Sequence, residues 1–131
     1  MPFIRITALG PTLTAEQISR LQNEVTNLME SVLGKVANLT SVLVEQPPVA
    51  GWSIGRKAMR VAVHVHATIT AGTNSTEEKA SFIDKIMQLL KSVFGPELST
   101  ATYIVVDEVP AQSWGYDGRT QDARRLAAAP L

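Results

Sequence analysis

Residues 14–34 read TAEQISRLQNEVTNLMESVLG, and residues 75–95, which begin 61 positions later, read STEEKASFIDKIMQLLKSVFG. Each stretch opens with a hydroxyl residue that is followed three positions later by Gln or Glu. This is the capping-box pattern, which satisfies free N–H groups at a helix start. Each stretch ends with a glycine, which suits the left-handed backbone after a helix. We therefore predict two equivalent helices, one in each half of the chain.

Apolar side chains recur within both stretches at steps of three and four, the period of an amphipathic helix. The first set is Ile18, Leu21, Val25, Leu28 and Val32, and the second is Phe82, Ile86, Leu89 and Val93. Each helix is therefore expected to pack one apolar face against the rest of the protein.

Short apolar or β-branched segments flank each helix and predict one strand before it and one after it. They are residues 2–6 and 41–44 in the first half, and residues 60–70 and 103–106 in the second. Pro47, Pro48 and Pro110 follow the second strand of each half, and a proline cannot donate a hydrogen bond to a β-ladder. Each half therefore reads strand, helix, strand, and such a crossover makes its two strands parallel.

The two halves agree beyond their helices. Trp52 and Trp114 stand 62 positions apart, and a glycine turn containing an arginine follows each of them. We predict a single α+β domain over residues 1–131, with βαβ repeats at 2–57 and 60–120 and a C-terminal tail at 121–131. The repeats are expected to form a four-stranded mixed sheet with two helices on one face. The tail is expected to contact another subunit or to remain loose.

The composition narrows the class of protein. The chain has 131 residues, with 12 basic and 12 acidic side chains and no cysteine. The charge balance gives no basic surface for nucleic acid, and the lack of cysteine excludes disulfides and thiolate chemistry. No apolar run approaches the roughly 18 residues typical of a membrane span, and the N-terminus lacks a secretion signal. We therefore expect a cytoplasmic protein without nucleic-acid or membrane partners.

The long strand predicted over residues 60–70 presents two different faces. Its alternating sets are Val61, Val63 and Val65 on one side, and Ala62, His64 and His66 on the other. Two helices can cover only one face of the sheet, so a further subunit is expected on the second face. His64 and His66 share a face, but the sequence supplies no third metal ligand at a recognisable spacing. We interpret them as interface residues and expect no metal.

Pro2 follows the initiator Met1, and a methionine before so small a residue is usually removed during maturation. Removal would leave Pro2 with a free secondary amine held in a rigid ring. Burial in an apolar pocket lowers the pKa of an amine below its usual value near ~8, so this amine would be a general base at neutral pH. A proline without any catalytic role is the alternative interpretation of these residues alone.

A duplicated βαβ unit with proline after the initiator methionine resembles the tautomerase superfamily, and the match covers residues 2 to about 120. The superfamily includes 4-oxalocrotonate tautomerase, macrophage migration inhibitory factor and cis-3-chloroacrylic acid dehalogenase. Residues 39–42 are similar to the segment entering the second strand of 4-oxalocrotonate tautomerase, and residues 45–47 and 108–112 to stretches of the dehalogenase. Lys35 and Tyr103 fall where migration inhibitory factor has a pocket lysine and a pocket tyrosine.

Other positions depart from the patterns of the superfamily. The arginines that 4-oxalocrotonate tautomerase uses to bind a dicarboxylate are replaced here by Pro11 or Thr12, by Thr73, by Leu43 and by Tyr103. The resemblance therefore implies a tautomerase-like pocket without carrying over a known specificity.

The resemblance implies that Pro2 is the general base of a cofactor-independent keto–enol tautomerase acting on a small 2-oxo acid or its enol. It also implies a homotrimer with pockets at subunit interfaces and a small-molecule carboxylate as the substrate. Two alternatives stay open. One is a hydratase or dehalogenase in which Pro2 acts as an acid while Asp117 activates water. The other is a trimeric binding protein without catalysis.

Five further residues are candidates for substrate binding: Lys35, Tyr103, Arg119, Trp114 and Trp52. Lys35 and Arg119 could hold the carboxylate, although a cation at a helix C-terminus or in a solvated turn would also explain them. Tyr103 could polarise the enolate oxygen or pack within the sheet. The two tryptophans could wall the pocket or pack in the core or at an interface.

Overall fold

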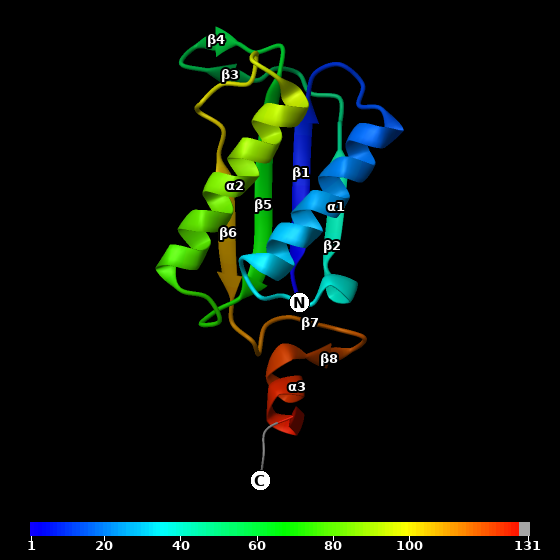
Figure 1. Cartoon of the computed structure of the whole chain (residues 1–131), viewed down its shortest axis with the longest axis vertical. Coiled ribbons are helices and arrows are strands. Elements are labelled where there is room, and N and C mark those ends of the chain that lie inside the picture. The colour runs from blue at the N-terminus through cyan, green and yellow to red at the C-terminus, as the bar shows by residue number, and fades with distance from the viewer. Residues whose placement is uncertain (129–131) are drawn as a thin grey trace.

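The computed structural model describes residues 1–128 of the chain. Its main sheet is built from β1 (Phe3–Leu9), β2 (Ser41–Glu45), β5 (Ala62–Thr70) and β6 (Ile104–Val109). The long helices α1 (Ala15–Ser31) and α2 (Thr76–Phe94) lie side by side on one face of it (Figure 1). Beyond opposite ends of the sheet lie two small hairpins, β3–β4 (Ser53–Ile54, Lys57–Ala58) and β7–β8 (Gly115–Tyr116, Arg119–Thr120) (Figure 1). The 3₁₀ turn η1 (Ala37–Leu39) precedes β2, and the helix α3 (Gln121–Ala128) follows β8.

The strand order of the main sheet is β2-β1-β5-β6. Within each repeat the two strands are parallel, because the helix between them carries the chain back to the same end of the sheet. The repeats meet antiparallel through β1 and β5, where Ile6 pairs with Val65. The structure confirms the predicted α+β fold, a four-stranded mixed sheet of two βαβ units with α1 and α2 on one face (Figure 1).

The core lies between this face and the two helices. Alternate residues of the central strands are buried there, and so are the inner residues of the predicted helical stripes. The fully buried members include Ile4, Ile6, Val65, Ile69, Leu21, Val25, Phe82 and Ile86. Burying one such large side chain contributes about 1.5–3 kcal/mol, so the stripes hold both helices on the sheet.

Both predicted capping boxes are present. The Thr14 hydroxyl accepts from the Gln17 N–H at 3.1 Å, and the Ser75 hydroxyl accepts from the Glu78 N–H at 3.1 Å. Gly95 is the C-cap of α2 as predicted, with φ of +80°. α1 ends at Ser31 with Val32 as its C-cap, two residues before the predicted Gly34, which nevertheless has the predicted left-handed backbone with φ of +67°.

Several strand boundaries also differ from the sequence prediction. β1 begins at Phe3 rather than at Pro2, and β5 begins at Ala62 rather than at residue 60. Tyr103 precedes β6, which instead runs on to Val109. The predicted tail contains the short helix α3, whose start is capped by the Thr120 hydroxyl accepting from the Ala123 N–H at 3.0 Å. Tail residues 129–131 lie outside the described residues.

The second face of the sheet is not covered by a helix of the described residues (Figure 1). Apolar side chains on or beside this face are well exposed, with Phe3 at 41% and Tyr103 at 73%. Polar pairs lie among them: His66 Nε2 is 3.1 Å from Asp107 Oδ2, and Thr7 donates to Glu45 at 2.8 Å. Such a mixed, open face is typical of a surface that another subunit covers.

Candidate active site

Pro2 directly precedes the first residue of the central strand β1. Its carbonyl oxygen accepts a hydrogen bond from the Ser41 N–H at 3.2 Å. This bond ties the chain end to the start of β2, so the terminus does not project freely into solvent. The Pro2 side chain is fully buried. Met1 precedes it in the structure, so the Pro2 nitrogen is here a tertiary amide and becomes an amine only when Met1 is removed.

Two adjoining cavities meet at this end of the sheet and share Met1, Leu39 and Tyr116 as lining residues. One has a volume of about 460 Å³, and its lining includes Pro2, Phe3, Ser41, Thr68 and Trp114. The other has a volume of about 350 Å³, and its lining includes Lys35, Thr70, Thr73, Gln121, Arg124 and Arg125. We call the two together the Pro2 pocket. Their size suits a small molecule.

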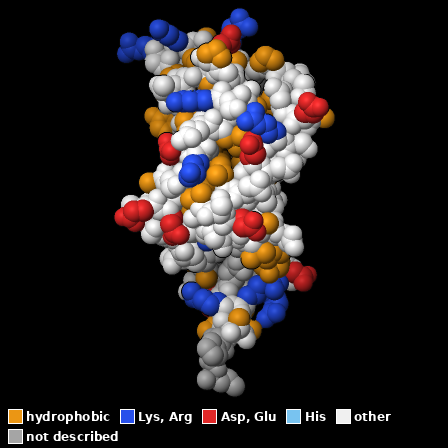
Figure 2. Space-filling model, viewed as in Figure 1, with side chains coloured by type: hydrophobic (Ala, Val, Ile, Leu, Met, Phe, Trp, Pro, Cys, Tyr) orange, Lys and Arg blue, Asp and Glu red, His pale blue; other side chains and the backbone are white. Residues whose placement is uncertain are grey.

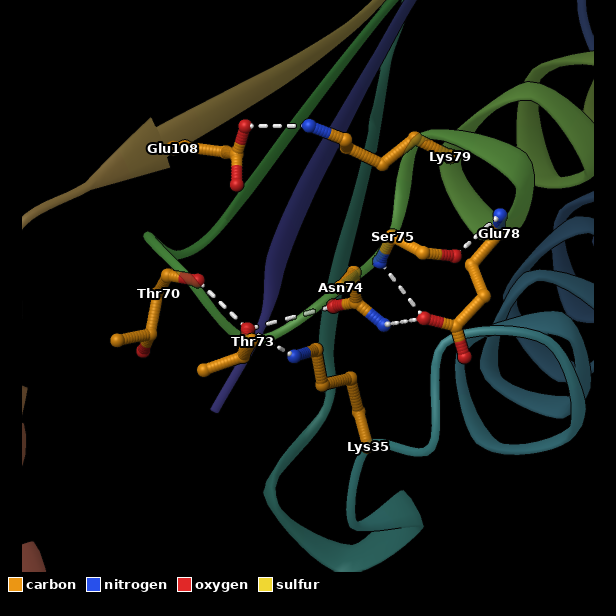
Figure 3. Close-up of polar contacts among 8 residues, drawn as sticks. All are labelled: Lys35, Thr70, Thr73, Asn74, Ser75, Glu78, Lys79 and Glu108. Atoms are coloured by element: carbon orange, nitrogen blue, oxygen red, sulfur yellow. Dashed lines mark hydrogen bonds and ion pairs between the residues drawn. The ribbon is translucent and has the colours of Figure 1, made fainter.

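Lys35 is the cation beside the chain terminus. Gly34, with φ of +67°, turns the chain out of α1, and the Lys35 N–H then donates to the Met29 carbonyl at 3.0 Å. The Lys35 ammonium donates to the Thr73 hydroxyl at 2.8 Å, and this hydroxyl donates to the Thr70 carbonyl at 2.6 Å (Figure 3). Lys35 is thereby held in place by neutral partners.

The charges around the terminus alter its acid–base behaviour. Burial lowers the pKa of the Met1 amine below its usual value, and the Lys35 charge lowers it further. Burial also lowers the pKa of Lys35 itself, against the opposing effect of Glu78 and Glu108. The pocket thus favours a neutral amine at the chain end.

The two carboxylates nearest Lys35 are engaged elsewhere. Glu78 accepts from the Ser75 N–H at 2.8 Å, and Glu108 accepts from the Lys79 ammonium at 2.7 Å (Figure 3). These hydrogen bonds are the largest causes that hold the pKa of each carboxyl below its usual value. Both groups therefore stay ionised without forming a hydrogen-bonded pair with Lys35.

The β7–β8 hairpin supplies the aromatic wall. Trp114 donates from its indole Nε1 to the Thr70 hydroxyl at 3.2 Å, which fixes the ring beside β5. A Cβ atom on Gly115 would overlap the carbonyl group of Arg119, so only glycine fits there. The predicted glycine turn therefore has a structural reason, and it presents Trp114 and Tyr116 to the Pro2 pocket.

Helix α3 brings two arginines that the sequence analysis did not single out as site residues. The Arg124 guanidinium lies 3.8 Å from the centroid of the Tyr116 ring, and its Nη2 donates to the Tyr116 carbonyl at 3.0 Å. Arg125 pairs with Asp122 at 2.7 Å. Figure 2 shows Lys and Arg side chains gathered where α3 joins the body of the molecule. The adjacent arginine pair was the available signal, but nothing in its spacing linked it to Pro2.

Of the predicted binding residues, the structure brings Lys35 and Trp114 to the Pro2 pocket. Tyr103 and Trp52 lie together at the opposite end of the sheet, where they line a separate cavity of about 280 Å³. The reason is topological, because residue 103 precedes the start of β6 whereas Pro2 lies next to the position where β6 ends. Arg119 lies exposed in β8 and does not line the Pro2 pocket.

Two negative findings concern the described residues 1–128. Within them, no group of three His, Cys, Asp or Glu side chains could hold a metal ion. None of their helices is both long enough and apolar enough to cross a membrane.

A family model described as Tautomerase enzyme matches residues 2–61, which comprise the first repeat with Pro2 and Lys35. The first repeat therefore has the sequence pattern of the tautomerase family. Solved structures with the superfamily fold align over both repeats. A fused 4-OT described as a wild-type asymmetric trimer has a TM-score of 0.80 and 18% identity, over 93% of this chain and 98% of its own.

A member of the cis-3-chloroacrylic acid dehalogenase family aligns with a TM-score of 0.78 and 16% identity, over 98% of this chain and 92% of its own. A macrophage migration inhibitory factor-like protein from Entamoeba histolytica aligns with a TM-score of 0.74 and 19% identity, over 91% of this chain and 97% of its own. At these identities the likeness shows the tautomerase-superfamily fold alone. No curated protein matches the chain in a sequence comparison.

Proposed function

We propose that this chain is a cofactor-independent keto–enol tautomerase that acts on a small 2-oxo acid or its enol, with Pro2 as the general base after Met1 is removed. The observation that carries the proposal is the placement of Pro2. Pro2 is buried just before the start of the central strand β1, in a pocket that also contains Lys35.

The electrostatics support a neutral amine at this position. Burial and the charge of Lys35 both lower the pKa of the amine at the chain terminus. Pro2 lines the same pocket as Met1, so we expect burial and the Lys35 charge to lower the pKa of the Pro2 amine in the same direction once Met1 is gone. An amine that is unprotonated near neutral pH can take a proton from a carbon acid.

The reaction then needs one base and one cation. The Pro2 nitrogen takes a proton from the carbon next to the carbonyl group, and the electron pair of that C–H bond forms the enolate. The protonated amine then gives this proton to the enolate oxygen, which yields the enol. In the ketonisation direction the Pro2 nitrogen first takes the enol O–H proton, and the protonated amine then transfers that proton to carbon. The Lys35 ammonium donates to the Thr73 hydroxyl rather than to a carboxylate, so its charge can stabilise the negative charge that develops on the enolate.

A homotrimer completes the proposal. The open face of the sheet carries exposed Phe3 and Val105 and is suited to contact with other copies of the chain. The similar fused 4-OT structure is described as a trimer. In such an assembly Tyr103 and Trp52, which lie far from Pro2 of their own chain, would reach the pocket of a neighbouring subunit.

The hydratase or dehalogenase alternative needs a carboxylate that activates water. No Asp or Glu is among the described residues that line the Pro2 pocket. Asp117, the candidate from the sequence, lies in the turn of the β7–β8 hairpin with φ of +49° and is not part of that lining. The geometry therefore favours the tautomerase.

The test is the ketonisation of phenylenolpyruvate, followed by ultraviolet absorbance with protein whose intact mass shows that Met1 is absent. Pro2→Ala replaces the rigid secondary amine by a primary amine and should lower kcat/KM, at most by the about 10²–10⁴-fold that the loss of a general base costs. Pro48→Ala, in an exposed loop, is the matched control and should retain full activity. Native protein that lacks Met1 and is no faster than buffer would exclude the tautomerase, and would leave the non-catalytic binding protein.

A further inference from the structure

Helix α3 places two guanidinium groups in the wall of the Pro2 pocket. Arg124 and Arg125 line the same cavity as Lys35, although they come from the opposite end of the chain. They lie in the part of the chain that follows the second repeat, so the repeat pattern itself does not account for them. The repeat pattern therefore does not explain why two arginines lie next to Pro2, the proposed base.

The Arg124 guanidinium is held in place, but most of its N–H groups have no hydrogen-bond acceptor among the described residues. Its guanidinium is stacked on the Tyr116 ring, and among the described residues it makes a single hydrogen bond, to the Tyr116 carbonyl. An arginine has five N–H donors in a planar fork that matches a carboxylate. The Arg124 Nε is shielded from solvent and has no partner among the described residues, which is unfavourable for a charged donor group. An anion bound by the Arg124 fork would compensate this charge.

Arg125 is available as a second donor. Its side chain is 68% exposed, and its partner Asp122 lies one helical turn earlier on α3. An exposed pair of this kind contributes little stability, so a ligand can draw Arg125 away from it. The described lining of this cavity includes three cations, Lys35, Arg124 and Arg125, and no carboxylate, which gives it a positive potential.

We propose that Arg124, with Arg125 beside it, binds the carboxylate of the substrate, so that helix α3 is the specificity element of the pocket. Lys35 is then free to stabilise the enolate oxygen instead of holding the carboxylate. The inference rests on the proposed tautomerase for the identity of its substrate class. The anion site itself does not, because it can bind a carboxylate that does not react.

The test uses 3-phenylpropanoate and its neutral analogue 3-phenylpropanamide, neither of which can enolise as a 2-oxo acid does. Binding is followed by NMR through the indole N–H of Trp114, which lies in the Pro2 pocket. The native protein should bind the acid about tenfold more tightly than the amide, because hydrogen bonds to charged groups are the strong ones. Arg124→Gln and Arg125→Gln should each reduce that preference, and Lys35→Gln should leave most of it.

Arg119→Gln is the matched control, since Arg119 lies in the β7–β8 hairpin just before α3 but outside the pocket lining. Thermal unfolding shows whether each variant is folded. If Arg124→Gln unfolds, the binding preference is measured with Arg125→Gln alone. This variant should stay folded, because the Arg125 side chain is exposed and it is Arg124 that is stacked on Tyr116. An acid preference that disappears in Lys35→Gln but persists in both arginine variants would overturn the inference, as would equal binding of acid and amide by the native protein.

The two proposals fail in different ways. If the acid preference depends on Arg124 but phenylenolpyruvate is not ketonised, the tautomerase is wrong and the anion site stands. If ketonisation depends on Pro2 but its KM and the binding preference are unchanged in Arg124→Gln and Arg125→Gln, the anion site is wrong and the tautomerase stands.

Discussion

The two ends of the sheet are built from equivalent parts of the two repeats, yet they differ in chemistry. At one end Lys35 and Thr73 line a cavity of about 350 Å³ beside Pro2. At the other end Thr12 and Pro96 line a cavity of about 330 Å³. Thr12 lies 61 positions before Thr73, and Pro96 lies 61 positions after Lys35. The duplicated fold therefore provides two cavities, of which one has a cation at this position.

The chain terminus makes the second difference. Arg60 and Val61 line the far cavity as part of a continuous backbone, so no amine exists there. Only the first repeat begins at a chain end, and only its first residue can present a free nitrogen. Duplication of the repeat copies the cavity but not the chain terminus, so each chain is expected to have one site.

The largest effect is expected from moving the terminus. An alanine inserted between Met1 and Pro2 would turn the Pro2 nitrogen into an amide and so make this end of the sheet like the far end. We expect kcat/KM for phenylenolpyruvate to fall by about 10²–10⁴-fold, as for the loss of a general base. An alanine inserted after Pro48, in an exposed loop, is the control. Full activity of the extended terminus would show that the Pro2 amine is not the base.

Replacing the cation is expected to have the next largest effect. Lys35→Gln should lower kcat/KM by about 10–100-fold, because one stabilising charge is lost. The Lys35 charge lowers the pKa of the terminal amine, so its removal raises that pKa. The rise of kcat/KM with pH, which follows deprotonation of the base, should therefore move to higher pH. The shift should be partial, because burial is the larger cause.

The reciprocal change introduces a cation at the far end of the sheet. Pro96→Lys would place an ammonium group at the position equivalent to Lys35, and the fold of the second repeat can be checked by thermal unfolding. We expect no new activity in a protein that also carries Pro2→Ala, since the far end still lacks an amine. Turnover in that double variant above the level of Pro2→Ala alone would contradict the assignment of the chemistry to the terminus.

The smallest effect is expected at the threonine that holds Lys35. Thr73→Val removes the hydroxyl that accepts from the Lys35 ammonium at 2.8 Å. A net loss of about 1 kcal/mol for one hydrogen bond should lower kcat/KM by about fivefold. Thr12→Val makes the same change at the equivalent position of the far end and should leave kcat/KM unaltered. Equal effects of the two variants would indicate a general loss of stability rather than a role for Thr73 in the site.

Much of the fold could be predicted because its signals are local. The capping boxes at Thr14 and Ser75 and the glycine after α2 each act within a few residues, so the sequence alone defines them. Strand ends were less accurate, as Tyr103 shows. Its β-propensity favours a strand, but the ladder begins only where Ile104 meets Val65, and that register is set by the pairing of β6 with β5, which is distant in the sequence.

The candidate site was predicted only in part, for a related reason. Pro2 and Lys35 carry their own signals, a chain end and a residue after a helix-terminating glycine. The adjacent pair Arg124–Arg125 gives no indication of its position, because the place of Arg124 in the pocket depends on the Tyr116 ring and on how α3 follows the hairpin. Arg119 attracted attention through its turn, yet β-pairing with Tyr116 leaves it exposed outside the pocket.

The Pro2 pocket joins the first and the last parts of the chain, since Pro2 and Lys35 come from the beginning and Arg124 from α3. On a ribosome that adds about 5–20 residues per second, roughly 6–25 s separate the synthesis of Pro2 from that of Arg124. During this interval α3 has not been synthesised and cannot cover Met1, which lines the same cavity as Arg124. The order of synthesis therefore allows the terminus to be trimmed before the pocket is complete.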